Sequence, residues 1–259
     1  MHENERHSLI LSVLRQETVV TVNDLVKLTN SSKATVRRDI IALDSAKKLR
    51  KIHGGVEALH PPTAGLVGRP FNYNRSMNLD KKRAIAEKAV EICDDNDDII
   101  INGGTTTFQM VHFLARRRLK VFTNSFPIAE HLIHNSANLV AMPAGTIYRE
   151  QKIILSPFEN DGTKNFSAKR MFMGAQGISN RGIMEADPLI VQAEEKLINQ
   201  ADELIMLLDS SKFAKRSSLV VCALSKISKV ITDSDISAEA VEMIQEAGIE
   251  LIIVPVKKN

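Results

Sequence analysis

Tryptophan is absent from the sequence, and tyrosine occurs only twice among its 259 residues. Core volume must therefore come from aliphatic side chains, nine Phe and nine Met. The only cysteines, Cys93 and Cys222, lack metal-ligand spacing, which favours a reduced, cytoplasmic protein with buried free thiols. Apolar runs long enough to cross a bilayer, about 18 residues, are missing, so we expect no membrane helix. The first residues, MHENERHSLI, are largely polar, so we expect no signal peptide.

The positive charge of the chain is concentrated near its N-terminus. Residues 1–60 hold ten Lys and Arg against seven Asp and Glu, whereas the other 199 residues hold 24 of each. The whole net charge of +3 therefore lies in the first quarter, which indicates an anionic partner there.

Three segments of this quarter carry apolar residues at helical spacing, 4–16, 22–28 and 32–48. Asn23 is a candidate N-cap for the second helix. The stretch LRKIHGGVEAL, residues 49–59, is predicted to form two short strands joined by a turn at His53-Gly54-Gly55, because Gly-Gly supplies the positive φ that a hairpin needs. The sequence thus predicts a small domain, residues 1–59, of three helices and a hairpin.

The rest of the chain has a different pattern. Residues 60–79 contain prolines and little periodicity, which predicts a linker. Residues 80–259 alternate apolar strands with amphipathic helices, and the segment TTTFQMVHFLARR is expected to be one of these helices. Several strands are continuously apolar, which is typical of a mainly parallel sheet with helices on both faces.

The stretch SSKATVRRDIIALD combines a helix cap, an apolar stripe and two adjacent arginines. Ser32 can accept hydrogen bonds from the first free amides of the helix. On a helical wheel, Ile40 and Leu43 fall within about 40° of Val36. Arg38 points about 200° away from that stripe. The helix can therefore pack on two others while it presents guanidinium groups outward.

This layout is typical of a recognition helix in the major groove of DNA, where arginine pairs with guanine. The preceding short helix completes a helix-turn-helix, and the hairpin would form its wing. The candidate DNA contacts are Ser32, Lys33, Thr35, Arg37, Arg38, Arg50, Lys51 and His53. A solvated basic face, or a surface for protein contacts without a DNA role, is the alternative interpretation of these arginines.

The segment SSKATVRRDIIALDSAKKLRKIHGG resembles the winged helix-turn-helix of the DeoR family of bacterial sugar-metabolism regulators. Ala46-Lys47 stands where that family usually has a glycine before the wing. The resemblance implies double-stranded operator DNA as a partner, and it implies that Asp39 pairs with a nearby arginine inside the domain. The matching positions are Ser32, Thr35, Val36, Arg37, Arg38, Asp39, Ile40, Leu43, His53, Gly54 and Gly55.

A second candidate site follows an apolar strand, at the turn INGGTTT. Its glycines let backbone amides approach a ligand, its threonines add hydroxyl donors, and a helix N-terminus favours an anion, so the turn suits a phosphate. It lacks the lysine of a Walker loop and the third glycine of a dinucleotide fingerprint. A plain turn with a threonine cap is the alternative interpretation.

Other strand ends add polar groups that suit a small phosphorylated polyol. Lys212 would neutralise the phosphate, while Asp209 or Asn102 would bind sugar hydroxyls; a surface turn is the alternative reading of Asp209 and Lys212. The candidate effector site comprises Asn102, Gly103, Gly104, Thr105, Thr106, Thr123, Asn124, Ser125, Gly145, Asp209 and Lys212.

The stretches INGGTTT, VFTNS, GAQGI with RGIMEADP, and LLDSSKF resemble the DeoR-type sensor domain, so the resemblance spans nearly the whole chain. It implies an α/β fold similar to ribose-5-phosphate isomerase and a phosphorylated sugar effector, without a cofactor. The family usually has Asp where Asn102 stands and Gly-Gly where Ala144-Gly145 stands. INGGTTTF, TNSFPIAEHLI and IILSPF most resemble the branch that controls L-ascorbate utilisation, whose effector is L-ascorbate 6-phosphate, with Ser156 as a further candidate contact.

We therefore predict an α/β protein in which a winged helix-turn-helix precedes a mainly parallel sensor domain. It would be a repressor of a carbohydrate-utilisation operon, and a homodimer or homotetramer, because paired half-sites need paired wings. The alternative is a sugar-phosphate isomerase with an accessory DNA-binding domain, whose candidate bases are Glu185, Asp187 and Asp209. No metal site is expected from the histidines in helical patterns, His112, His131 and His134.

Overall fold

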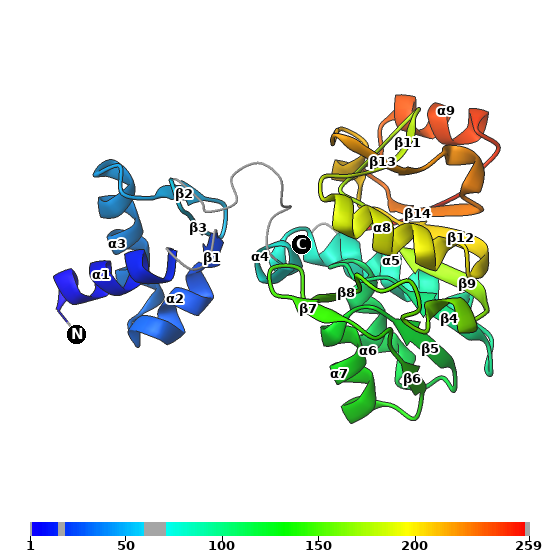
Figure 1. Cartoon of the computed structure of the whole chain (residues 1–259). Coiled ribbons are helices and arrows are strands. Elements are labelled where there is room, and N and C mark those ends of the chain that lie inside the picture. The colour runs from blue at the N-terminus through cyan, green and yellow to red at the C-terminus, as the bar shows by residue number, and fades with distance from the viewer. Residues whose placement is uncertain (1, 15–18, 60–70, 257–259) are drawn as a thin grey trace. The chain divides into compact units, whose positions relative to one another are not determined.

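The computed structural model describes residues 2–14, 19–59 and 71–256. The chain divides into two compact units, residues 1–77 and 78–259, which are described separately here (Figure 1). Most of the predicted linker, residues 60–70, lies outside the described residues. None of the described helices is both long and apolar enough to cross a membrane.

Among its described residues, unit 1 contains four helices and a small antiparallel sheet with strand order β1-β3-β2 (Figure 1). The three predicted helices and the predicted hairpin are confirmed, whereas β1 was not predicted. The elements are α1 (Glu3–Leu14), β1 (Val19–Thr21), α2 (Val22–Thr29), α3 (Lys33–Ser45), β2 (Arg50–Ile52), β3 (Gly55–Glu57) and α4 (Phe71–Ser76).

The buried cluster around α3 in unit 1 is aliphatic. The α3 stripe of Val36, Ile40 and Leu43 is buried and packs with residues of the other helices and the sheet. Gly55 has to be glycine, because a Cβ there would lie 2.4 Å from the carbonyl oxygen of Val20 on β1. The wing is therefore held to the rest of the unit by close backbone contact.

Both ends of α3 have well-formed caps. Ser32 accepts a hydrogen bond from the Thr35 amide at 3.1 Å, which confirms the predicted N-cap. At the other end, the Lys47 amide donates to the Asp44 carbonyl and the Lys48 amide to the Leu43 carbonyl, each at 2.9 Å. These two bonds form a Schellman motif, in which Lys47 takes the left-handed position that usually belongs to glycine, with φ 51°.

Replacing Lys47 by glycine is expected to stabilise unit 1, because glycine adopts positive φ without the steric cost that a side chain brings. We expect a gain of about 0.5–1 kcal/mol in the free energy of unfolding, measured by denaturant titration. Lys48→Gly is the matched control, since Lys48 lies outside the left-handed region. An equal gain in both variants would contradict this explanation.

The predicted cap of α2 was wrong. Thr21, not Asn23, is the N-cap: its hydroxyl oxygen accepts from the Asp24 amide at 3.1 Å and donates to the Asp24 carboxylate at 2.6 Å. Strand β1 leads directly into α2 and delivers Thr21 in the extended conformation that a cap needs. Asn23 lies inside the helix and is exposed.

Part of the predicted linker is helical. Residues 71–76 form α4, and Phe71 at its start is buried within unit 1, where α4 contacts β1. The docking of Phe71 agrees with the aromatic character of this stretch, FNYNR.

Unit 2 is built on a parallel sheet with strand order β15-β14-β12-β9-β4-β5-β6, in which every described pairing is parallel. The predicted parallel α/β architecture is confirmed. The strands are β4 (Asp98–Ile101), β5 (Lys120–Thr123), β6 (Leu139–Ala141), β9 (Ala168–Met173), β12 (Ala201–Leu207), β14 (Lys229–Asp233) and β15 (Glu250–Val254).

Helices cover this sheet (Figure 1). Leu197 of α8 and Ile244 of α9 share a core with Ile100 of β4, while α5, α6 and α7 contact one another in sequence. The helices are α5 (Leu79–Glu91), α6 (Val111–Leu114), α7 (Phe126–Asn135), α8 (Pro188–Ile198) and α9 (Ala238–Glu246). The predicted single helix of TTTFQMVHFLARR is instead a 3-10 turn, η1 (Thr107–Met110), followed by the short α6.

Two small antiparallel sheets, which were not predicted, lie outside the main sheet. One is the hairpin of β7 (Thr146–Tyr148) and β8 (Ile153–Leu155). The other has the order β10-β11-β13, with β10 (Gly177–Ser179), β11 (Gly182–Glu185) and β13 (Leu219–Cys222).

Candidate DNA-binding surface and effector site

The outer face of α3 carries exposed positive charge. Arg37 and Arg38 are exposed, and neither guanidinium has a hydrogen-bond or ion-pair partner among the described residues. Lys33 at the start of the helix is exposed as well, and Ile41 beside the arginines is 51% exposed. Free guanidinium groups next to an exposed apolar side chain match the hydrogen-bonding edge of guanine and the methyl group of thymine.

Asp39 lies on the opposite side of the same helix and is 4% exposed. Its carboxylate accepts two hydrogen bonds from Arg6 of α1, at 2.7 and 2.9 Å, and lies 3.2 Å from the His7 ring. Burial alone would raise the pKa of Asp39, but the hydrogen bonds and charge of Arg6, with His7, lower it. The predicted internal arginine partner of Asp39 is thereby confirmed, and it clamps α3 to α1.

The wing residues divide into two groups. Arg50 donates from Nε to Glu57 of β3 at 3.0 Å, so part of its hydrogen-bonding capacity is used within the sheet, although its side chain is 64% exposed. Lys51 and His53 are exposed, and only the backbone amide of Lys51 is engaged, with Asp44 at 2.8 Å. Lys51 and His53 are therefore better placed than Arg50 to meet a phosphate.

In unit 2, the strand order reverses between β4 and β9: the chain continues through β5 and β6 on one side, and through β12, β14 and β15 on the other. Such a reversal creates a crevice outside the carboxyl ends of the two strands. Asn102, at the end of β4, is 1% exposed and donates from its backbone to Phe172 of β9 at 2.9 Å. The candidate turn therefore begins at the position where ligands collect in this architecture.

The backbone amide of Gly103 ties two strand ends together. It donates to the side-chain oxygens of Asn102 and Asn124, each at 2.8 Å, and Asn124 follows β5. Thr123 donates to the Ile101 carbonyl at 2.6 Å and accepts from the Ser125 amide at 3.0 Å. Asn102, Gly103, Thr123, Asn124 and Ser125 thus form one connected cluster, as predicted.

The threonines of the turn have different roles. Thr105 is half-buried and Thr106 is buried, whereas Thr107, which was not predicted, donates to the carbonyls of Asn102 and Gly104 at 2.8 and 3.1 Å. These bonds hold the turn in shape and explain why a 3-10 turn begins here. Because η1 and α6 are short, a helix dipole cannot be the main attraction for a phosphate at this turn.

Positive charge comes from two lysines near the end of β12. Burial lowers the pKa of Lys82, on α5, to about 8, although the negative charge of Asp209 acts to raise it. Burial and the charge of Lys215 likewise lower the pKa of Lys212, although the charges of Asp209 and Glu185 act to raise it. Asp209 caps the 3-10 turn η3 (Ser210–Lys212) through the Ser211 amide at 3.1 Å. An anion beside these lysines would favour their charged forms.

The sequence reading missed Lys82 and Glu194. Glu194 of α8 is 4% exposed, and its Oε1 accepts from the Asn102 side chain at 2.9 Å. Burial, and then the charge of Glu185, raises the pKa of Glu194 well above its usual value, which favours the uncharged acid. Both residues stand in the apolar stripe of their helix, Lys82 beside Ile85 and Glu194 beside Leu197, and a charge in such a stripe was the available signal.

The β7–β8 hairpin covers the candidate turn. A Cβ on Gly103 would lie 2.2 Å from the Ile153 side chain, and the Ile154 amide donates to the Asn124 carbonyl at 2.7 Å. Gly145 precedes the hairpin, and a Cβ there would lie 2.5 Å from the Leu155 carbonyl, so close packing accounts for this glycine. Ser156 and Asn124 border a space of about 10 Å³, enough for one water-sized group.

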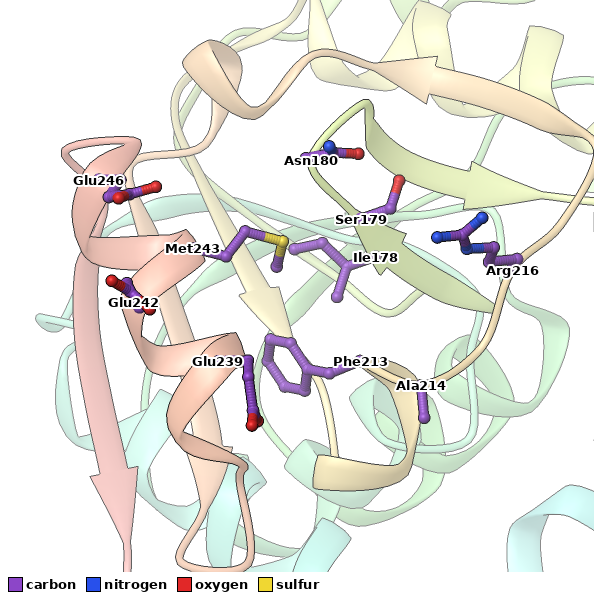
Figure 2. A pocket seen from close by; sticks show the side chains of 10 residues that line it. All are labelled: Ile178, Ser179, Asn180, Phe213, Ala214, Arg216, Glu239, Glu242, Met243 and Glu246. Carbon is purple, nitrogen blue, oxygen red and sulfur yellow. The ribbon is translucent and has the colours of Figure 1, made fainter.

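A larger groove of about 680 Å³ lies elsewhere in unit 2 (Figure 2). Its apolar side chains include Phe213 and Met243, and Glu239, Glu242 and Glu246 of α9 border it. Three carboxylates repel a phosphate, and only Arg216 offers a positive charge in the lining. The strand-end cluster is therefore the better candidate for an anionic effector. Among the described residues, no group of three His, Cys, Asp or Glu side chains could hold a metal ion.

A winged helix-turn-helix with exposed arginines, joined to a parallel α/β unit with lysines and buried polar groups at its strand ends, defines a ligand-sensing DNA-binding protein. Residues 6–61 match the DeoR-like helix-turn-helix domain, and residues 77–234 match the DeoR C terminal sensor domain. The chain belongs to the DeoR family of transcriptional regulators, and it is a DNA-binding regulator rather than an isomerase.

Relatives of known name cover almost the whole chain. The HTH-type transcriptional regulator UlaR of Shigella dysenteriae serotype 1 is 30% identical over 254 residues, 97% of this chain and 99% of the relative. UlaR of Escherichia coli K12 gives the same identity and coverage. Among solved structures, ribose 5-phosphate isomerase A of Methanocaldococcus jannaschii is 16% identical with a TM-score of 0.40, over 52% of this chain and 55% of that chain. The family assignment rests on the sequence matches.

Proposed function

We propose that the protein is a repressor of a carbohydrate-utilisation operon, and that its affinity for operator DNA changes when a phosphorylated sugar binds to unit 2. Residues 1–59 bind the DNA, residues 60–79 join the two parts, and residues 80–259 sense the effector. The protein acts in the cytoplasm as a homodimer or homotetramer, because two half-sites need two wings. DNA binding is supported above all by the pair of exposed arginines on α3, Arg37 and Arg38, which have no partner in the described part of the chain.

The phosphate of the effector binds between the turn Gly103-Gly104-Thr105-Thr106 and the lysines Lys82 and Lys212. Lys82 is buried and Lys212 is half-buried, and the charge of Asp209 acts on both, which supports a cationic site at this position. The β7–β8 hairpin has to move to admit a whole sugar phosphate, since Ile153 occupies the space over Gly103. Effector binding would therefore change the conformation of unit 2 through movement of this hairpin.

L-ascorbate 6-phosphate is the first effector to test, because INGGTTTF, TNSFPIAEHLI and IILSPF resemble the branch of the family that responds to it. The protein is tested against a panel of pentose, hexose and ascorbate phosphates. We expect one of these sugar phosphates to raise the melting temperature by several degrees, and the shift should grow with the logarithm of the ratio of its concentration to Kd. The corresponding free sugars should give no shift.

Lys212→Ala is expected to weaken binding of that sugar phosphate by roughly tenfold or more, because a charge-assisted hydrogen bond contributes about 1.5–3 kcal/mol. Isothermal titration calorimetry measures the loss. Lys226→Ala is the control, since Lys226 is exposed and lies on a different turn of the same unit, η4 (Leu224–Lys226). Equal affinity of Lys212→Ala and the parent protein would contradict the placement of the phosphate.

A further inference from the structure

Three buried side-chain atoms around the Gly103 turn have no hydrogen-bond partner among the described residues. They are Nδ2 of Asn124, Oγ of Ser125 and Oε2 of Glu194. These side chains are 2%, 1% and 4% exposed, so bulk solvent does not satisfy them. Buried polar atoms are nearly always paired, and an unpaired group at a crevice points to a ligand.

The hydrogen bonds that are present show which atom of each side chain lacks a partner among the described residues. Gly103 uses the oxygen of Asn124, so the Asn124 amide N–H groups remain. Asn102 uses its oxygen for Gly103 and one N–H of Nδ2 for Oε1 of Glu194, so both polar atoms of its side chain have a partner. The second oxygen of Glu194 is therefore left, and it is held beside the turn by Asn102.

A carboxyl group at position 194 is unusual for its surroundings. Glu194 stands on α8 between the buried residues Ile190 and Leu197, where an apolar side chain would pack without a desolvation penalty. The hydrogen bond from the Asn102 side chain uses only one of the two carboxyl oxygens of Glu194. A ligand group that meets the other oxygen accounts for the acid.

We propose that Glu194, with Asn124 and Ser125, determines effector specificity by binding a hydroxyl or carbonyl oxygen at the uncharged end of the effector. This inference rests on the proposed function and adds an orientation to it. The phosphate lies on the side of the Gly103 turn that faces Lys82 and Lys212, and the hydroxyl-bearing end lies toward Asn124 and Ser125, which follow β5, and toward Glu194 of α8. Asn102 is a positioning residue that holds the carboxyl group in place.

Calorimetric titration of the full-length protein with two kinds of ligand tests the proposal. One kind carries hydroxyls and a phosphate, L-ascorbate 6-phosphate and D-ribose 5-phosphate, and the other, propyl phosphate, offers the phosphate alone. Glu194→Leu should bind the preferred sugar phosphate roughly 5- to 150-fold more weakly, the effect of removing a hydrogen bond to a buried polar group, and should bind propyl phosphate unchanged. Glu194→Gln, which keeps the shape and a donor, should retain sugar-phosphate binding within a few-fold.

Glu195→Leu is the matched control, because Glu195 is the exposed neighbour on the same helix, and it should bind both ligands as the parent protein does. Parent-like sugar-phosphate binding by Glu194→Leu overturns the inference, as does an equal loss for both ligands, which would assign Glu194 a structural role. A parent protein that binds none of the sugar phosphates overturns the proposed function instead, so the two failures are distinguishable.

Discussion

Replacing Asp39 by alanine should unfold much of the DNA-binding unit while the sensor unit stays folded. The substitution removes both hydrogen bonds that Arg6 donates to Asp39, and with them the ion pair that joins α1 to α3. We expect the free energy of unfolding to fall by about 3 kcal/mol, the lower end of the range for breaking a buried ion pair, because Arg6 keeps some solvent contact. Because a unit of this size has a small free energy of unfolding, this loss should unfold it, and DNA binding should be lost as well.

Hydrogen exchange of the full-length protein, read separately for the two units, measures this effect. Protection of the α3 amides should fall by about two orders of magnitude in Asp39→Ala. Asn23→Ala is the control, since Asn23 is an exposed polar residue of the same unit, inside α2. If α3 keeps its protection in Asp39→Ala, the pair with Arg6 does not hold the helix.

Arg38→Ala should cost about 1–3 kcal/mol of operator affinity, roughly 5- to 150-fold in Kd, and should relax sequence preference at one base position. Arg38 points away from the buried stripe and has no partner among the described residues, so its guanidinium is available for a bidentate contact with guanine. Because the side chain makes no internal bond, the variant should be as stable as the parent protein.

Lys33→Ala separates base reading from phosphate contact. It should weaken binding to all sequences alike and reduce the slope of log K against log salt by about one unit. Fluorescence anisotropy with an operator and a scrambled duplex, at several salt concentrations, distinguishes the two patterns. Arg38→Ala with the sequence preference of the parent protein would mean that Arg38 does not read a base.

The helix-turn-helix was predictable from sequence because its signals are local. The cap at Ser32, the stripe of Val36, Ile40 and Leu43, and the turn at Gly54 each follow from residues within one or two helical turns. Strand β1 was not predictable in this way. Three residues carry no usable alternation, and its partner β3 lies about 35 residues further along the chain.

In unit 2, most of the candidate site was predictable from the sequence, because its residues follow the ends of apolar strands. The two missed residues come from helices, not from strand ends. Lys82 and Glu194 reach the site only because α5 and α8 pack on the sheet with these side chains turned inward. The covering β7–β8 hairpin and the conformation of the GGTTT turn depend on contacts between distant segments, such as Ile153 with Gly103, which spacing along the sequence does not reveal.

The most direct test of the central claim measures operator affinity with and without the effector. The Kd for operator DNA is determined by anisotropy at fixed salt, first alone and then with each sugar phosphate that shifts the melting temperature. Coupling between the two units predicts that one sugar phosphate changes this Kd by about 5- to 150-fold, and that DNA changes the affinity for the sugar phosphate by the same factor. An operator Kd that stays the same at saturating concentrations of every sugar phosphate that binds would contradict the account.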